Sequence, residues 1–110
     1  MALTRDFKDT VKARAERDPE VRAGLFREAI EALLSDDMET GKVLLRDYVN
    51  ATVGFDALAA ELDKNPKSLM RMLSDKGNPR ADNLLGMIGH LKQREGMAVT
   101  VSRERGLHAR

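Results

Sequence analysis

The sequence predicts a mainly α-helical protein, a compact helical bundle that contains a helix-turn-helix, with added N-terminal helices and one short C-terminal β-strand. Apolar residues recur every three or four positions along most of the chain. The polar breaks carry helix-start signals, as at Asp18-Pro19 and Asn65-Pro66. The apolar period changes to two only after Gly96. With 110 residues, the chain is most simply a single domain, 1–110, around one core.

Residues 1–52 are expected to form the N-terminal helices. The first helix covers Leu3–Arg17 and has a narrow apolar stripe. The second runs from about residue 19 to residue 34 and has a wide apolar face. The third follows the polar break at 35–37 and runs from Met38 to about residue 50. Tyr48 lies on its apolar stripe, so we expect a core position and not a base-stacking role.

Residues 54–95 are expected to form the helix-turn-helix core. One short apolar stripe, Phe55 to Leu62, ends at the polar break 63–65, and a second begins after Pro66. Asn65 can cap the second helix, and proline fits the first helical position because no amide partner is needed there. Two short helices joined by a tight turn describe a helix-turn-helix, whose second helix can enter the DNA major groove.

The charge of this segment agrees with DNA binding. From Lys64 to Arg80 there are five basic residues and a single acid, Asp75. Lys67 and Arg71 are four positions apart and share one helix face, which suits phosphate and guanine contacts. We expect base-edge contacts from Pro66, Lys67, Ser68 and Arg71, and phosphate contacts from Lys64, Lys76, Asn78 and Arg80, with Asn65 beside them at the turn.

The last helix is expected to open at Asp82, to close the core with a broad apolar face that includes Leu84 and Leu85, and to end at Gly96. Residues 97–102 then alternate, which places Met97, Val99 and Val101 on one side of a strand. A lone strand needs a partner. We expect the same strand of a second copy, which makes the protein a homodimer, followed by a flexible tail, 103–110.

The chain resembles the addiction-module antidote (antitoxin) family, helix-turn-helix transcriptional regulators of the phage-repressor-like superfamily. The resemblance covers roughly residues 40–102 and is carried by Leu58-Ala59-Ala60-Glu61, Lys67-Ser68-Leu69 to Leu73, Lys76-Gly77-Asn78-Pro79-Arg80 and Asn83-Leu84-Leu85. At the turn the chain departs from the family pattern, since Asp63 stands where a glycine is usual and Lys64 where an apolar residue is usual. An L-residue at such a left-handed corner costs about 1 kcal/mol.

The two halves of the chain differ in charge. Residues 1–63 carry 9 Lys and Arg against 14 Asp and Glu, for a net −5, whereas residues 64–110 carry 10 against 4, for a net +6. A basic half favours polyanions. The helix-turn-helix and the basic half predict a dimeric, sequence-specific DNA-binding regulator, and the resemblance implies that it is of antitoxin type and represses its own operon. The alternative is a protein-binding antidote whose acidic N-terminal half covers a basic, RNA-cleaving toxin. An ordinary solvated surface would also explain the charge division.

No pattern of catalytic residues is visible in the sequence. There is no cysteine and no glycine-rich phosphate loop. We expect the two histidines, His90 and His108, to face solvent, so the chain is not expected to be an enzyme or to hold a metal or a cofactor. No apolar run approaches the roughly 20 residues of a membrane span, and the N-terminus lacks a signal-peptide core. A cytoplasmic protein is expected.

Overall fold

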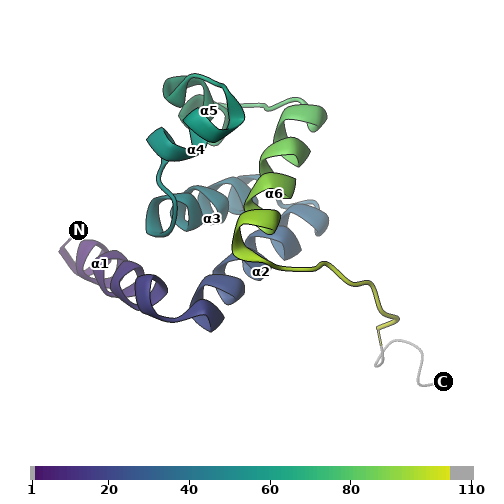
Figure 1. Ribbon diagram of the computed structural model, residues 1–110. Helices are drawn as coiled ribbons and strands as arrows, with labels where there is room; N and C mark the ends of the chain where they lie inside the picture. The colour runs from purple at the N-terminus through teal and green to yellow at the C-terminus, as the bar shows by residue number, and fades with distance from the viewer. Residues whose placement is uncertain (1, 105–110) are drawn as a thin grey trace.

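A computed structural model describes residues 2–104 of the chain, with side chains from residue 10 onward. These residues form six helices, so the mainly helical part of the expected fold is confirmed (Figure 1). The helices are α1 (Ala2–Arg17), α2 (Pro19–Leu34), α3 (Met38–Ala51), α4 (Phe55–Leu62), α5 (Pro66–Met72) and α6 (Ala81–Glu95). Their bounds lie within one or two residues of those expected from the sequence.

Local side-chain caps start three of the helices. The Asp18 side chain accepts a hydrogen bond from the Glu20 amide at 2.9 Å, and the Asn65 side chain accepts one from the Lys67 amide at 2.8 Å. A proline follows each of these two caps at the first helical position. Asp37 caps α3 by accepting from the Thr40 amide at 3.2 Å. These starts need only neighbouring residues, which explains why the sequence predicts them well.

The corner between α4 and α5 turns at Asp63. This residue has φ 56° and ψ 48°, which is the left-handed conformation that glycine adopts most easily. The Lys64 amide donates to the Ala59 carbonyl at 2.8 Å, and this bond closes the end of α4. The chain therefore reaches a glycine-type corner with an aspartate, as the departure from the family pattern indicates.

We expect Asp63→Gly to raise the free energy of unfolding by up to about 1 kcal/mol, because glycine removes the cost of the left-handed backbone. Urea unfolding of the wild type and the variant measures the difference. Asp36, at φ 60°, is the matched second site, and Asp36→Gly should give a gain of the same sign. A loss of stability at Asp63 alone would contradict the prediction and would show that its side chain stabilises the turn.

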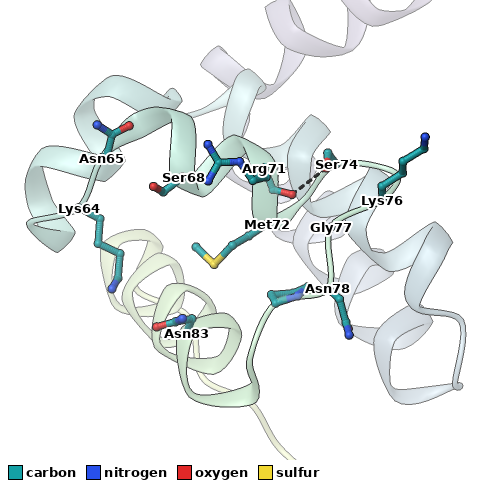
Figure 2. A pocket seen from close by; sticks show the side chains of 11 residues that line it. Lys64, Asn65, Ser68, Arg71, Met72, Ser74, Lys76, Gly77, Asn78 and Asn83 are labelled. Carbon is teal, nitrogen blue, oxygen red and sulfur yellow. Dashed lines mark hydrogen bonds between the residues drawn. The ribbon is translucent and has the colours of Figure 1, made fainter.

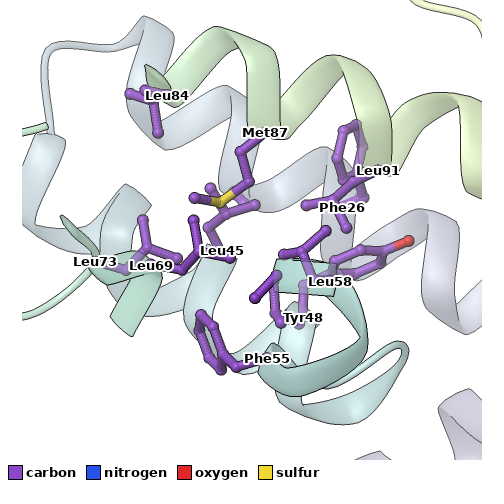
Figure 3. Close-up of a cluster of buried hydrophobic side chains, with 13 residues drawn as sticks. Phe26, Leu45, Tyr48, Phe55, Leu58, Leu69, Leu73, Leu84, Met87 and Leu91 are labelled. Carbon is purple, nitrogen blue, oxygen red and sulfur yellow. The ribbon is translucent and has the colours of Figure 1, made fainter. Parts of the chain in front are cut away.

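The core is built from α2 to α6 around a set of fully buried leucines (Figure 3). Tyr48 is 2% exposed, and its ring packs edge-on against Phe26 with ring centroids 5.3 Å apart, so the core prediction for Tyr48 is confirmed. The buried cluster comprises Phe26, Ala29, Leu45, Tyr48, Val49, Phe55, Leu58, Ala59, Leu69, Leu73, Leu84, Met87 and Leu91.

A polar network ties the end of α6 to three other helices. The Tyr48 hydroxyl donates to Glu95 Oε1 at 2.9 Å, and Arg22 Nε donates to Glu95 Oε2 at 2.7 Å. A second Arg22 nitrogen donates to the Ala15 carbonyl of α1 at 2.7 Å. Burial, together with the hydrogen bond to Glu95, raises the pKa of Tyr48 above its ordinary value. The phenol therefore stays protonated and keeps donating to the carboxylate.

His90 does not simply face solvent, which corrects the expectation from the sequence. Its Nε2 lies 2.5 Å from Glu61 Oε1, and Arg94 Nε donates to the same carboxylate at 3.2 Å. The hydrogen bond with His90 and then the one from Arg94 lower the pKa of Glu61. This cluster joins α4 to α6, and sequence could not show it because Glu61 and His90 lie on different helices. His108 lies outside the described residues.

The expected strand at 97–102 is not present in this chain. Gly96 ends α6 in the left-handed conformation, as expected, and the Met97 amide donates to the Lys92 carbonyl at 3.0 Å. The residues that follow, to residue 104, form neither helix nor strand, because a strand needs a partner backbone and none within residues 2–104 is bonded to them. Met97 packs against the core instead, whereas Val99 and Val101 are exposed. Most of the expected tail, residues 105–110, lies outside the described residues.

The apolar face of α6 is narrower than the sequence indicates. Leu84 is 7% exposed and belongs to the core, but its neighbour Leu85 is 64% exposed. Consecutive helical residues point about 100° apart, so the two leucines cannot both face one narrow contact surface. Among the described residues, no helix is both long enough and apolar enough to span a membrane.

Candidate nucleic-acid interface

A hollow of about 610 Å³ lies between α5, the loop that follows it and the first turn of α6 (Figure 2). Apart from Asn83, all the lining residues lie between residues 64 and 79, in the segment where the sequence places the DNA contacts. Met72 points into the hollow from α5, and Asn83 faces it from α6 (Figure 2). The lining residues are Lys64, Asn65, Ser68, Arg71, Met72, Ser74, Lys76, Gly77, Asn78, Pro79 and Asn83.

Six of the nine residues expected to contact DNA meet at this hollow, namely Lys64, Asn65, Ser68, Arg71, Lys76 and Asn78. The other three do not line it. Pro66 forms the first position of α5, and Lys67 is exposed on the first turn of that helix. Arg80 pairs with Asp82 at 3.3 Å on the surface, just before α6. The hollow thus brings together expected contacts from both sides of α5, and the outermost of these, Lys64 and Asn78, are fourteen positions apart.

The lining of the hollow is cationic. Lys64, Arg71 and Lys76 are exposed, and among the side chains that the structure describes no Asp or Glu lines the hollow with them. Within residues 2–104, none of these three side chains has a hydrogen bond or an ion pair with a protein carboxylate. Amide and hydroxyl groups of Asn65 and Ser68 complete the polar surface. Free cations beside neutral donors and acceptors are suited to a phosphate backbone and to base edges.

Lys42 of α3 holds the loop that forms one wall, and sequence reasoning missed it. Its Nζ donates to the carbonyl oxygens of Ser74, Asp75 and Gly77 at 2.9, 3.2 and 2.6 Å. Although it carries a charge, Lys42 is only 6% exposed. A signal was available, because Lys42 interrupts the apolar stripe that Leu45 continues on α3, and a lysine on such a stripe requires buried acceptors.

Arg46, one turn further along α3, adds a fourth hydrogen bond to this region. One of its guanidinium nitrogens donates to the Leu73 carbonyl at 3.2 Å, at the end of α5. Two cations from α3 therefore lie at the negative end of α5, where the helix dipole favours positive charge. The end of α5 and the loop that follows it are consequently tied to α3.

Gly77 lets the loop fold back closely on α5. A Cβ atom at this position would collide with the Arg71 carbonyl oxygen and would lie 2.8 Å from the carbonyl oxygen of Met72. Because α5 ends at Met72, Gly77 does not end the helix and serves this close backbone approach. The approach brings Lys76 and Asn78 to the same hollow as Arg71.

No group of three or more His, Asp or Glu side chains able to hold a metal ion occurs in the described part of the chain. The hollow offers a cationic surface with amide and hydroxyl groups, a combination that is suited to anions. Comparisons with protein-family models, with curated proteins and with solved structures give no match to this chain.

Proposed function

We propose that this chain is a sequence-specific DNA-binding transcriptional regulator in which α4, the turn at Asp63 and α5 act as a helix-turn-helix. The observation that carries the proposal is the cationic hollow beside α5, which has three free basic side chains and no carboxylate in its lining. In this arrangement α5 is the recognition helix and lies in the major groove. The loop after α5 then lies along the DNA backbone.

The positions of the side chains divide the contacts into two kinds. Ser68 and Arg71 project from α5 and are placed to reach base edges, where arginine can bind a guanine through two hydrogen bonds. Lys64 before the helix, and Lys76 and Asn78 after it, are placed to bind phosphates on either side of the groove. The phosphate contacts set the register, and the base contacts select the sequence.

We further propose that the regulator acts as a homodimer and represses its own operon, as an antitoxin-type protein does. Val99 and Val101 are 60% and 95% exposed, and the backbone from residue 98 to residue 104 has no hydrogen bond among the described residues. Such an exposed, unpaired segment favours pairing with the same segment of a second copy. Two copies would then read half-sites about 34 Å apart on a palindromic operator.

Fluorescence anisotropy tests the proposal with two duplexes, one from directly upstream of the coding sequence and one with the same bases scrambled. The expected result is binding to the upstream duplex at least about 10³-fold tighter than to the scrambled one. Affinity for both should fall steeply with salt, because bound phosphates release counterions. A protein that binds both duplexes equally, and enriches no sequence from a random pool, would refute sequence-specific recognition.

Arg71→Ala is expected to lower the affinity for the upstream duplex by about 1 to 3 kcal/mol and to relax specificity at one base pair, because the bidentate guanine contact is lost. Anisotropy on a set of single-base-pair variants of the duplex measures both effects. Arg27→Ala is the matched control, since this exposed arginine of α2 lies outside the hollow and its loss changes the net charge equally. A uniform loss on every duplex would instead make Arg71 a phosphate contact.

A second function, neutralisation of a basic RNA-cleaving toxin, is favoured by the surface around the turn from α2 to α3. Leu34 is 82% exposed at the end of α2, and the acidic residues Glu31, Asp36, Asp37 and Glu39 near it in the chain are exposed as well. An apolar anchor among carboxylates suits a basic protein partner. Co-expression with the product of the adjacent gene tests this function. Rescue of growth supports it, and unchanged toxicity or a harmless neighbour counts against it.

A further inference from the structure

We propose that Lys42 is a positioning residue for DNA binding: through its hydrogen bonds to the loop after α5, it sets where Lys76 and Asn78 meet the phosphate backbone. This inference rests on the proposed function. It adds that one wall of the binding hollow is set from α3, by a residue that is itself buried and does not line that hollow. Lys42 therefore influences DNA affinity without touching DNA.

The hydrogen bonds of Lys42 are complete. An ammonium group has three donors, and Nζ has three carbonyl acceptors in a stretch of four residues, those of Ser74, Asp75 and Gly77. Burying a lysine is costly unless its charge is paired or hydrogen-bonded, so each of these bonds matters to the folded state. Because three carbonyls of the loop accept from the same ammonium group, these bonds also define the path of the loop. Moving one carbonyl away would leave a buried donor of Lys42 unsatisfied.

Lys76 and Asn78 are the two side chains whose positions Lys42 is proposed to set. Within residues 2–104, the side chains of Lys76 and Asn78 make no hydrogen bond or ion pair. Their placement therefore depends on the backbone of the loop, which is held by Lys42, by the Gly77 amide bond to the Ser74 carbonyl at 3.0 Å, and by the close approach of Gly77 to α5. Preorganisation of this kind reduces the entropy that DNA binding would otherwise lose.

Lys42 also controls the electrostatics of the loop. The carbonyl oxygens that accept from Nζ are directed toward α3, so their partial negative charges face an ammonium group and not a bound phosphate. Without Lys42 these carbonyls would be free to turn toward the hollow, where they would repel the DNA backbone. The expected loss is therefore one of phosphate contact, which weakens all sequences alike and leaves discrimination between sequences intact.

Lys42→Met tests the proposal, because methionine is apolar and of similar length but has neither charge nor donors. Relative to the wild type, affinity for the upstream and the scrambled duplex should fall about tenfold each, with their ratio unchanged. The slope of log affinity against log salt should become shallower by about 1. Lys76→Ala should give the same pattern, and the double variant should lose little more than either single variant because both act on one contact. Lys12→Met on α1, an exposed lysine, is the charge-matched control and should bind as the wild type does.

Several results would overturn the proposal. A folded Lys42→Met with wild-type affinity and salt slope would do so, as would losses from Lys42→Met and Lys76→Ala that multiply in the double variant. If Lys42→Met does not fold, Lys42→Arg takes its place, since guanidinium retains both charge and donors. It should keep the wild-type slope and lose less than about threefold in affinity. A folded Lys42→Arg that loses affinity about tenfold at the wild-type slope would refute the positioning role, because the loss would then not be one of a phosphate contact. If the wild-type protein shows no preference for the upstream duplex over the scrambled one, and its DNA affinity does not depend on salt, the proposed function is refuted and this inference with it.

Discussion

Gly77→Ala is expected to lower the free energy of unfolding by about 3 kcal/mol and to abolish specific DNA binding. The added Cβ would overlap the Arg71 carbonyl oxygen and would lie 2.8 Å from the carbonyl oxygen of Met72. Both are backbone atoms of the end of α5, so they cannot rotate away as a flexible side chain could, and overpacking of this kind is costly. The loop would have to move off α5, and the bonds from Lys42 would be lost with it.

Gly86→Ala on α6 is the matched control. A Cβ at Gly86 meets nothing within 4 Å, and alanine is the better helix former by up to about 1 kcal/mol. Urea unfolding of the two variants should therefore give changes of opposite sign for the same chemical substitution. Gly77→Ala with wild-type stability would contradict the prediction, because it would show that the loop does not need its close contact with α5.

Leu58→Ala is expected to lower the free energy of unfolding by about 3 to 5 kcal/mol, which is a large part of the total for a domain of this size. Leu58 on α4 is 0% exposed and belongs to the buried cluster formed by α2 to α6 (Figure 3). Removing its side chain leaves a cavity that a close-packed core closes only partly. Chemical unfolding at 25 °C measures the change.

Leu85→Ala serves as the control for Leu58→Ala. It removes the same atoms from a leucine that is 64% exposed, so the expected change is within about 0.5 kcal/mol. If the two variants lost equal stability, Leu85 would be buried in the protein in solution. Since Leu85 is exposed in the single chain, that outcome would point to a covered α6 surface, as in a dimer.

The turn from α4 to α5 has a strained backbone at Asp63, directly beside the hollow. The Asp63 corner costs some stability, yet it is solvent-exposed and leaves Lys64 at the edge of the hollow. A glycine at 63 would make the same corner more favourably. The stability gain expected for Asp63→Gly should therefore leave DNA binding unchanged, provided that Lys64 keeps its place.

Sequence by itself determined the helices of this protein. Asp18, Asp37 and Asn65 cap the helices that follow them, and Gly96 ends α6, because each of these signals acts through hydrogen bonds or backbone angles within a few residues. The apolar period also identified Tyr48 as a core residue. The cluster of basic residues between 64 and 80 was visible as well, because all nine expected contacts lie in this one contiguous segment, and six of them line the hollow.

The tertiary structure alone decided which residues from different helices contact one another. Lys42 is 32 to 35 positions from the carbonyls that it binds, and His90 is 29 positions from Glu61. Periodicity describes the faces of one helix and carries no information about the partner that covers each face. For the same reason Leu84 is buried while Leu85 is exposed, and residues 97–102 form no strand. Burial and strand pairing depend on contacts between distant segments, and those contacts form only when the whole chain packs.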